Sequence, residues 1–189
     1  TSLDGRIATK SGESRWITGP DARQYLHLMR SQFDAVLIGA GTARADNPML
    51  DIRLQGHSGP QPARVVMSRG LDLPLESRLM ATARNIRTIL LCGKDCPQPK
   101  RQSFVDQGAE VISCTADQPE TALRKLAECG LTRVLCEGGG QLAASLIAAQ
   151  LVDELALFNA GLVLGASGRA AIGPLNLGAL AAHPRFHLI

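Results

Sequence analysis

The sequence is poor in aromatic residues: tryptophan and tyrosine occur once each and phenylalanine four times, so aromatics make up 3% of the 189 residues. Proteins that hold single-stranded nucleic acid usually stack the bases on aromatic side chains, so this scarcity disfavours that class. The net charge of +3 is also too small to indicate nucleic-acid binding by itself. No apolar run approaches the ~20 residues that cross a membrane, and no signal peptide is visible. Small anionic ligands remain compatible with this composition.

Signatures of hydrolytic and metal-dependent catalysis are also missing. The sequence has no G-x-S-x-G and no H-E-x-x-H motif, and its histidines have neither metal-binding nor catalytic spacing. Among five cysteines, Cys92 and Cys96 form a C-x3-C pair, which is not a standard zinc motif. We therefore expect no bound metal, and we interpret the cysteines as small buried apolar side chains of a cytoplasmic protein. The histidines, interpreted as structural, are His27, His57, His183 and His187.

Short apolar runs alternate with helical patterns along most of the chain. The runs predict strands at residues 34–38, 63–68, 87–92, 109–113 and 133–136, and a longer strand at 155–164. Helices are predicted from Pro20 onward, over 119–129 with Asp117 as the cap, and over 141–151. The alternation predicts an α/β fold with a mostly parallel mixed sheet, helices on both faces and an antiparallel C-terminal edge. Length and a hydrophobic content of 45% suit a single domain over residues 1–189.

Three glycines separate an apolar strand from a helix in the stretch VLCEGGGQLAAS, residues 134–145. The start of a helix has unpaired N–H groups and a partial positive charge. Glycines just before it expose the backbone, so a phosphate can approach these groups directly. The stretch therefore indicates an anion site, to which Gln141 and Ser145 could add hydrogen bonds. The alternative is a merely tight strand-to-helix turn.

A second pair of glycines, Gly39 and Gly41, follows the apolar run at 34–38. The Rossmann fingerprint G-x-G-x-x-G is incomplete, because Arg44 stands at its third glycine position, and neither glycine cluster has the P-loop lysine. In open parallel sheets, ligands bind outside the carboxyl ends of the strands. If both strands that are followed by glycines belong to one sheet, their ends could therefore hold one dinucleotide between them.

Ser68 and Arg69 end another predicted strand. A hydroxyl and a guanidinium beside an adenosine ribose would suit the 2′-phosphate that distinguishes NADP from NAD, whereas the simpler interpretation is a polar strand end. Trp16 lies in a polar stretch, where it either packs in the core or lies along a nicotinamide ring. The first third of the chain has several arginines, which either form a solvated face or bind a phosphorylated substrate. They are Arg15, Arg30, Arg44 and Arg53.

Five stretches, in order along the chain, resemble a single family: SLDGRIA, SGESRWIT, FDAVLIGAGTARADNPMLDIR, VLCEGGGQLAASLIAAQLVDEL and GLVLG. The family is the reductase domain of riboflavin biosynthesis, which in many bacteria forms the C-terminal half of a bifunctional deaminase/reductase. DNPMLDIR and EGGGQLAASL are the specific parts of the match, which covers nearly all of the chain. The deaminase zinc signature, H-x-E with P-C-x-x-C, is absent. We therefore expect the chain to be a fragment of a longer bifunctional polypeptide, with the deaminase domain upstream.

The resemblance implies a fold like that of dihydrofolate reductase and a cytoplasmic, homodimeric enzyme. It implies NADPH as the hydride donor and 5-amino-6-(5-phospho-D-ribosylamino)uracil as the substrate, whose ribosyl group is reduced to give the ribitylamino product. Two alternatives stay open. One is another NADPH-dependent reductase of the dihydrofolate reductase fold, and the other is a non-catalytic nucleotide-binding module.

The resemblance also implies roles for individual residues. Arg30 and Arg53 suit the sugar phosphate, and Glu137 suits polar groups of the substrate. As a separate hypothesis of mechanism, the proton would come from Glu137, the catalytic candidate, from Ser14 or from water. The implied substrate-binding residues are Ser14, Arg30, Leu50, Arg53 and Glu137. The implied cofactor-binding residues are Trp16, Thr42, Asp46, Ser68, Gly139, Gly140, Gln141, Leu142, Ala143, Ala144 and Ser145.

Overall fold

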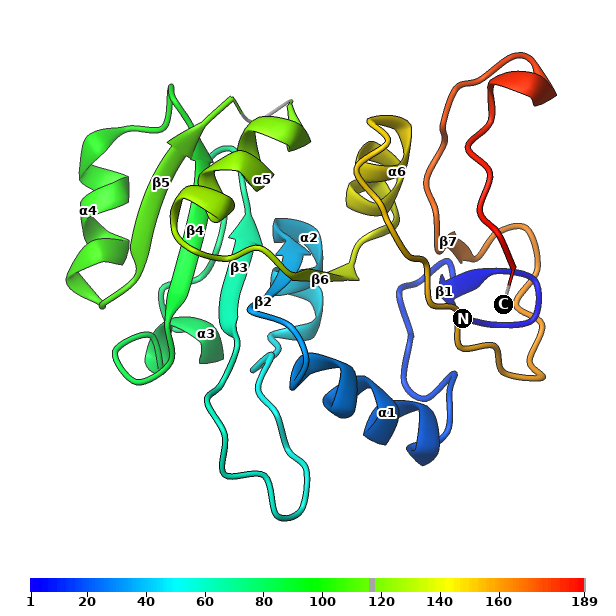
Figure 1. Cartoon of the computed structure of the whole chain (residues 1–189), viewed down its shortest axis with the longest axis horizontal. Coiled ribbons are helices and arrows are strands. Elements are labelled where there is room, and N and C mark those ends of the chain that lie inside the picture. The colour runs from blue at the N-terminus through cyan, green and yellow to red at the C-terminus, as the bar shows by residue number, and fades with distance from the viewer. Residues whose placement is uncertain (116–117, 189) are drawn as a thin grey trace. The chain divides into compact units, whose positions relative to one another are not determined.

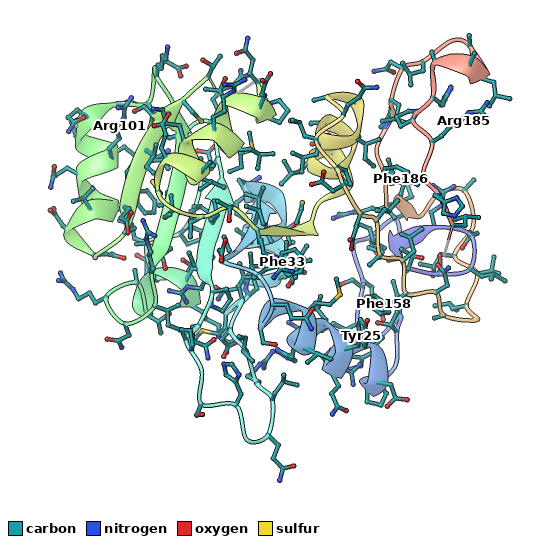
Figure 2. The ribbon with its side chains drawn as sticks, in the orientation of Figure 1. Tyr25, Phe33, Arg101, Phe158, Arg185 and Phe186 are labelled. Atoms are coloured by element: carbon teal, nitrogen blue, oxygen red, sulfur yellow. The ribbon has the colours of Figure 1, made fainter. Side chains whose placement is uncertain are left out.

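The structure, a computed structural model, describes residues 1–115 and 118–188. The chain divides into two compact units, one formed by Tyr25–Gly138 and the other by Thr1–Gln24 together with Gly139–Ile189. Figure 1 shows the elements of both units, and Figure 2 adds their side chains in the same view. The single domain expected over residues 1–189 stays a prediction. No helix among the described residues is long and apolar enough to cross a membrane.

The unit Tyr25–Gly138 is built on a parallel sheet of five strands, in the order β5-β4-β3-β2-β6 (Figure 1). Each strand coincides within two residues with an apolar run that predicts one. The runs are continuously apolar because both faces of such a sheet are covered. The strands are β2 Ala35–Gly39, β3 Ala63–Met67, β4 Thr88–Gly93, β5 Glu110–Cys114 and β6 Val134–Gly138.

Helices cover both faces of this sheet, which confirms the predicted layers. The chain steps from β2 to β5 in one direction across the sheet and returns to β6 after α5. Right-handed connections then put α2, α3 and α4 on one face and α5 on the other; Figure 1 shows α5 in front of β4. The helices are α1 Pro20–Arg30, which begins in the other unit, α2 Ala40–Asp46, α3 Arg78–Ala81, α4 Gln98–Asp106 and α5 Pro119–Glu128.

The core of this unit lies between the sheet and its helices. Val66 and Leu90 belong to a buried cluster that also contains Phe104 of α4. The neighbouring strand positions Val65 and Ile89, which point to the opposite face, are likewise 0% exposed. Because each fully buried aliphatic side chain contributes about 1.5–3 kcal/mol, the sheet is a firm base for groups at its carboxyl edge.

The other unit has less regular structure. An antiparallel pair joins β1 (Arg6–Ala8) to β7 (Arg169–Ala170). The helix α6 spans Gly140–Ala148, and a short 3-10 helix, η1, spans Leu180–Ala182. An antiparallel pair that includes a C-terminal strand is therefore found, but it joins β7 to the N-terminal β1 in a two-stranded sheet of its own and does not form an edge of the five-stranded sheet.

The strand predicted at residues 155–164 is wrong. Leu3 N–H donates to Leu162 O at 2.7 Å and Ala160 N–H donates to Thr1 O at 2.9 Å, but the pairing amounts to an isolated bridge. Val163 in this segment is 63% exposed. An apolar run forms a strand only where a neighbouring backbone continues the ladder of hydrogen bonds, and the apolar pattern does not specify that neighbour.

Three helices of the sheet unit, α2, α3 and α4, have no prediction from the sequence. Only Phe104 of α4 is buried, so this helix has no apolar stripe to reveal it. The helix α2 contains Gly41, a weak helix former, and α3 has only four residues. The cap predicted at Asp117 lies outside the described residues, and Gln118 precedes the first residue of α5.

Candidate functional site

Glu137 and Arg30 form a buried ion pair at the carboxyl edge of the sheet. Arg30 is the last residue of α1, and Glu137 is the last residue but one of β6. Arg30 Nε donates to Glu137 Oε1 and Nη2 donates to Oε2, both at 2.6 Å, and the two side chains are 8% and 10% exposed. Such paired bonds give a carboxylate a fixed orientation. Because both oxygens accept hydrogen bonds, Glu137 suits an orienting role better than proton donation.

A register shift sets the position of Glu137. Leu37 of β2 pairs with Cys136, but the next residue, Ile38, pairs with Gly138. Glu137 is therefore the extra residue of a bulge, a feature that is rare between parallel strands. Bulges interrupt the regular alternation of side chains and re-aim one of them, here the carboxylate that meets Arg30.

Arg30 also contacts the loop of residues 49–53, which we call the MLDIR loop. Its Nη1 donates to Asp51 O at 2.7 Å. The guanidinium thus uses Nε, Nη1 and Nη2 on acceptors of the protein, and Arg30 is only 7% exposed. The contact of Arg30 with a sugar phosphate stays a prediction.

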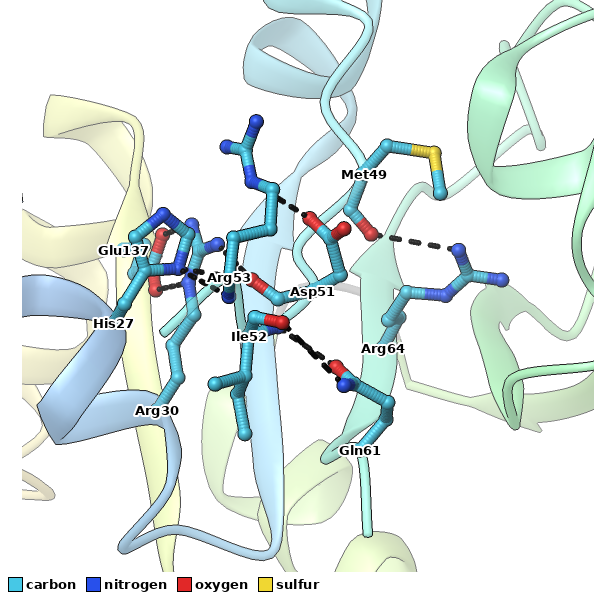
Figure 3. Close-up of polar contacts among 9 residues, drawn as sticks. All are labelled: His27, Arg30, Met49, Asp51, Ile52, Arg53, Gln61, Arg64 and Glu137. Atoms are coloured by element: carbon cyan, nitrogen blue, oxygen red, sulfur yellow. Dashed lines mark hydrogen bonds and ion pairs between the residues drawn. The ribbon is translucent and has the colours of Figure 1, made fainter. Parts of the chain in front are cut away.

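Side chains from outside the MLDIR loop fix its backbone at several points (Figure 3). Gln61 Oε1 accepts from Ile52 N–H at 2.7 Å, and Gln61 Nε2 donates to Ile52 O at 3.5 Å. Arg64 Nη1 donates to Met49 O at 3.4 Å. Leu50, between these contacts, has a φ of 55° and is 3% exposed. A non-glycine residue in the left-handed region persists only where its surroundings hold it.

Arg64 is the buried side chain that anchors the MLDIR loop. It lies in β3, is 0% exposed, and donates to Thr88 Oγ1 at 2.6 Å and to Thr82 Oγ1 at 2.7 Å. Further bonds reach the carbonyls of Leu79 and Ile86. Burial lowers the pKa of Arg64 to about 10, which still leaves the guanidinium charged at neutral pH. Arg64 therefore ties the MLDIR loop to β3, β4 and α3.

Arg53 is the exposed cation of the MLDIR loop. Its side chain is 64% exposed, and its Nε lies 3.4 Å from Oδ1 of Asp51, whose side chain is 19% exposed. Asp51 Oδ1 accepts no hydrogen bond from the described residues, so the pair is close but not directed. An ion pair of this kind contributes at most about 1 kcal/mol, so a phosphate can compete for the Arg53 guanidinium at little cost.

His27, in the last turn of α1, faces the MLDIR loop. Its Nδ1 lies 3.1 Å from Asp51 O and 3.2 Å from Arg53 N. The ring is half-buried, and burial lowers the pKa of His27, as do the charges of Arg30 and Arg53. His27 is therefore neutral near pH 7, and a neutral ring without a proton on Nδ1 can accept from Arg53 N–H.

The three glycines after Glu137 each have a structural reason, either close packing or a backbone angle that favours glycine. A Cβ on Gly138 would lie 2.9 Å from Cγ2 of Thr42. Gly139 has a φ of 89°, which glycine adopts most readily. Within the other unit, a Cβ on Gly140 would lie 2.5 Å from the carbonyl oxygen of Ala170. Packing thus supports the tight-turn interpretation, and an anion at the start of α6 stays a prediction.

Gly41 differs from these three glycines. A Cβ on Gly41, in the first turn of α2, would have no heavy atom within 4 Å. Glycine inside a helix costs about 0.5–1 kcal/mol relative to alanine, and packing within the described chain does not require it here. The bare backbone beside Thr42 leaves room for a ligand to approach closely.

The RibD C-terminal domain family matches residues 1–187 of the sequence. The chain belongs to this family. RibD of Actinobacillus pleuropneumoniae is 36% identical over 179 residues, which cover 93% of this chain and 46% of that protein. RibD of Acinetobacter baumannii superposes with a TM-score of 0.85 at 31% identity, over 98% of this chain and 50% of the other.

A solved structure of a deaminase and 5-amino-6-(5-phosphoribosylamino)uracil reductase from Thermotoga maritima gives a TM-score of 0.79 at 29% identity. It is covered over 50% of its length, and this chain over 100%. The chain thus spans about half the length of the relatives it matches. The likeness confirms the expected α/β architecture of the dihydrofolate reductase type, and membership of the RibD reductase family implies a nicotinamide cofactor.

The predicted cofactor residues of this RibD-like chain fall into both units. In the sheet unit, Thr42 lies in the first turn of α2 beside Gly138, and Asp46 is the exposed last residue of α2. Ser68 is 4% exposed, and its Oγ accepts from Asp72 N–H at 3.0 Å. The Ser68 hydroxyl thus closes the turn after β3, which supports its interpretation as a polar strand end.

The remaining predicted residues belong to the other unit. Trp16 is 70% exposed, and the guanidinium carbon of Arg23 lies 4.4 Å from the centre of its ring, so the core interpretation of Trp16 is wrong. Ser14 is half-buried in the segment before α1. In α6, Gln141 and Ser145 are exposed, whereas Ala144 is buried. The other predicted residues here, partly exposed, are Gly139, Gly140, Leu142 and Ala143.

Four residues of the site have no role in the sequence-based prediction: His27, Asp51, Gln61 and Arg64. Figure 3 shows them in and around the MLDIR loop, together with Arg30, Arg53 and Glu137. One signal was available, because His27 and Arg30 are three apart on a predicted helix and so share a face. The contacts of Gln61 and Arg64 depend on how the chain returns to the loop, and no local pattern indicates them.

Proposed function

We propose that this protein catalyses the NADPH-dependent reduction of the ribosyl group of 5-amino-6-(5-phospho-D-ribosylamino)uracil, as a step of riboflavin biosynthesis. Membership of the RibD C-terminal domain family supports the proposal, as does the likeness to a Thermotoga maritima protein that is named as this reductase. The chain spans about half of such relatives, so the activity of the whole protein is transferred here only as a proposal.

One observation carries the proposal. The buried, oriented carboxylate of Glu137 on β6 occurs together with the exposed guanidinium of Arg53 on the MLDIR loop. Arg30 holds Glu137 through two bonds of 2.6 Å and reaches Asp51 O of the MLDIR loop. Arg53 presents its guanidinium from the same loop with its side chain 64% exposed. A phosphorylated sugar needs a guanidinium for the phosphate and oriented acceptors for its polar hydrogens, and this arrangement supplies both.

The residues around α2 fit a nicotinamide dinucleotide. Gly41 has open space where a Cβ would be, and Thr42 presents a hydroxyl beside it in the first turn of α2. We propose that these residues bind the cofactor through backbone N–H groups; the cofactor role of the glycines at the start of α6, in the other unit, is a separate proposal that rests on the family resemblance. When bound, the cofactor supplies a hydride from its nicotinamide ring.

The reaction then mainly requires that the chain's own residues align the substrate with the hydride donor. The opened ribosylamine presents an imine carbon at C1′, which gains the hydride while its nitrogen gains a proton. Arg53 would fix the phosphate end and Glu137 the polar groups of the substrate, which keeps C1′ within about 3–3.5 Å of the donor carbon. Because both Glu137 oxygens accept from Arg30, the proton would come from Ser14 or from water.

Three further features complete the proposal. A deaminase domain would share the polypeptide, since the relatives are about twice as long as this chain and one of them is named as a deaminase as well. The protein would act as a homodimer, which rests on family resemblance alone, and in the cytoplasm, which the resemblance and the five free cysteines both support. Light scattering of the purified protein tests the dimer.

The decisive experiment follows NADPH oxidation with the phosphorylated ribosylaminopyrimidine as substrate. We expect turnover with NADPH and much slower turnover with NADH. Parallel assays use dihydrofolate, which would reveal a different reductase of the same fold. Tight NADPH binding without oxidation by any of these substrates would contradict the proposal and indicate a binding module.

A further inference from the structure

His27 is placed to control the backbone of the residue that carries the exposed guanidinium. It lies three residues before Arg30 on α1, and its Nδ1 is 3.2 Å from Arg53 N and 3.1 Å from Asp51 O. Figure 3 shows the ring beside both residues of the MLDIR loop. The two neighbours require opposite states of Nδ1. Arg53 N–H needs an acceptor, which is Nδ1 without a proton, whereas Asp51 O needs a donor, which is Nδ1 with a proton.

The two partners differ in how much they depend on His27. Asp51 O already accepts from Arg30 Nη1 at 2.7 Å, so it keeps a strong donor whatever the state of the ring. The hydrogen bond of Arg53 N–H, in contrast, goes to His27 Nδ1. A neutral ring with its proton on Nε2 therefore gives Arg53 N–H its acceptor and leaves Asp51 O to Arg30, whereas a protonated ring leaves Arg53 N–H without this acceptor.

The charged groups around His27 favour the neutral ring. On its own helix, Arg30 faces it; on the MLDIR loop, Arg53 faces it with a like charge and Asp51 with an opposite one. Glu137 of β6 is bound to Arg30, which leaves that carboxylate engaged. Burial and the two arginines together lower the pKa of His27. The ring is thus in its accepting state at neutral pH and leaves that state only as the pH falls through this lowered pKa.

We propose that His27 is a positioning residue for substrate binding: its neutral Nδ1 fixes the backbone of Arg53 and so aims the Arg53 guanidinium at the substrate phosphate. This inference rests on the proposed function, in which Arg53 binds that phosphate. Within residues 1–115 and 118–188, the one polar contact that the structure shows for the Arg53 side chain is the loose approach of 3.4 Å to Asp51 Oδ1. Fixing the backbone therefore decides where an exposed, flexible guanidinium can reach.

Protonation of His27 has two opposing effects on phosphate binding. An added positive charge attracts the phosphate, but at a partly exposed site this attraction is screened and is worth at most about 1 kcal/mol. Loss of the Nδ1 acceptor releases the Arg53 backbone, and small displacements of a binding group can cost far more. The proposal commits to the second effect, so the substrate should bind more weakly when His27 is protonated.

Two variants separate the acceptor from the rest of the ring. In His27→Asn the side-chain oxygen takes the place of Nδ1 and still accepts, whereas His27→Leu has no acceptor. A hydrogen bond contributes about 0.5–1.5 kcal/mol net, so His27→Leu should raise the KM for the phosphorylated substrate about 3- to 10-fold. The kcat and the KM for NADPH should change less than about 2-fold, and His27→Asn should stay close to wild type near pH 7.5.

The pH dependence gives a reading that a merely structural role would not produce. The substrate phosphate itself titrates near pH 6, so the profile of wild type is compared with that of His27→Asn, which keeps the titration of the substrate and loses only that of residue 27. We expect the KM of wild type to rise more steeply towards pH 5.5 than that of His27→Asn. Identical profiles would overturn the proposal, even if His27→Leu failed to fold.

A binding measurement distinguishes this inference from the proposed function. Calorimetric titration with ribose 5-phosphate needs neither NADPH nor turnover. If His27 acts through Arg53, the double variant His27→Leu/Arg53→Ala should bind ribose 5-phosphate no more weakly than Arg53→Ala alone. A further loss of the same size as in the single His27→Leu variant would refute the positioning role. Wild-type protein that binds ribose 5-phosphate but never oxidises NADPH would refute the proposed function instead.

Discussion

Arg30 and Arg53 both contact Asp51, and both are implied by family resemblance to bind the same phosphate, yet the structure gives them different environments. Arg30 is 7% exposed and has three directed hydrogen bonds to Glu137 and Asp51. The Arg53 side chain is 64% exposed and has one loose ion pair. The same charge, once at the end of α1 and once on the MLDIR loop, therefore stabilises the fold at the first position and remains available to a ligand at the second.

The difference arises from what surrounds each guanidinium. A buried charge must keep its partners, because an unpaired ion in the interior costs several kcal/mol. An exposed charge is hydrated, so exchanging water for a phosphate changes its free energy little until the phosphate is well placed. We expect substitutions of the first kind to lower stability and substitutions of the second kind to lower substrate affinity.

The largest effect is expected for Arg30→Met. The substitution leaves the Glu137 carboxylate buried without its two donors, which should lower the free energy of unfolding by about 3–5 kcal/mol. Urea denaturation measures this loss. The double variant Arg30→Met/Glu137→Leu removes both charges and should recover most of it, because well-packed apolar residues can replace a buried pair. A double variant no more stable than Arg30→Met would show that the ion pair is not the source of the loss.

Arg53→Ala should show the opposite division between folding and binding. Removing a charged hydrogen-bond partner costs about 1.5–3 kcal/mol, so the KM for the phosphorylated substrate should rise roughly 10- to 100-fold. The free energy of unfolding should change by less than about 0.5 kcal/mol, as is usual for an exposed site. Steady-state kinetics with each substrate varied in turn measures both KM values. Equal increases for NADPH and for the pyrimidine would contradict the assignment to the phosphate.

The sequence predicts the sheet of this protein much better than its site. Five apolar runs correspond to five strands because a parallel sheet covered on both faces needs continuously apolar segments. The same rule fails at residues 155–164, where an apolar run has no continuous backbone partner. It also misses α4, in which Phe104 is the only buried residue.

The site could be predicted as a set of residue types but not as an arrangement. The resemblance implied substrate roles for both Arg30 and Glu137, yet their pairing joins positions 107 residues apart. The contact between His27 and the backbone of Arg53 spans 26 residues, and it depends on the end of α1 facing the MLDIR loop. Neither a propensity nor a motif contains such information, because each describes a local stretch of chain.

Gly138 and Gly41 extend the comparison between positions that the fold requires and positions that are open to a ligand. Gly138→Ala would place a Cβ 2.9 Å from Thr42 Cγ2 and 3.2 Å from Ile38 Cγ2, so it should lower the free energy of unfolding by about 1–3 kcal/mol. Gly41→Ala meets no atom within 4 Å and should raise the free energy of unfolding by up to about 1 kcal/mol. If a ligand approaches this backbone, Gly41→Ala should nevertheless weaken NADPH binding, measured by fluorescence titration. Unchanged NADPH affinity in this folded variant would exclude the approach.

The smallest expected effect concerns the stability of the fold in mild acid. Unfolded His27 takes up a proton near its ordinary pKa of 6.5, whereas in the folded protein burial and the charges of Arg30 and Arg53 lower that pKa. Between the two pKa values the unfolded chain binds more protons, so the free energy of unfolding should fall as the pH drops below 6.5 and level off once folded His27 is protonated as well. Urea denaturation across pH 5 to 7.5 measures this decline, and His27→Asn should show a shallower one.

The comparison is informative because Arg30 and Arg53 act on His27 with the same sign: removing the exposed charge in Arg53→Ala should also make the decline shallower, without the large loss of stability expected for Arg30→Met. A decline as steep in His27→Asn as in wild type would place its origin in other titrating groups.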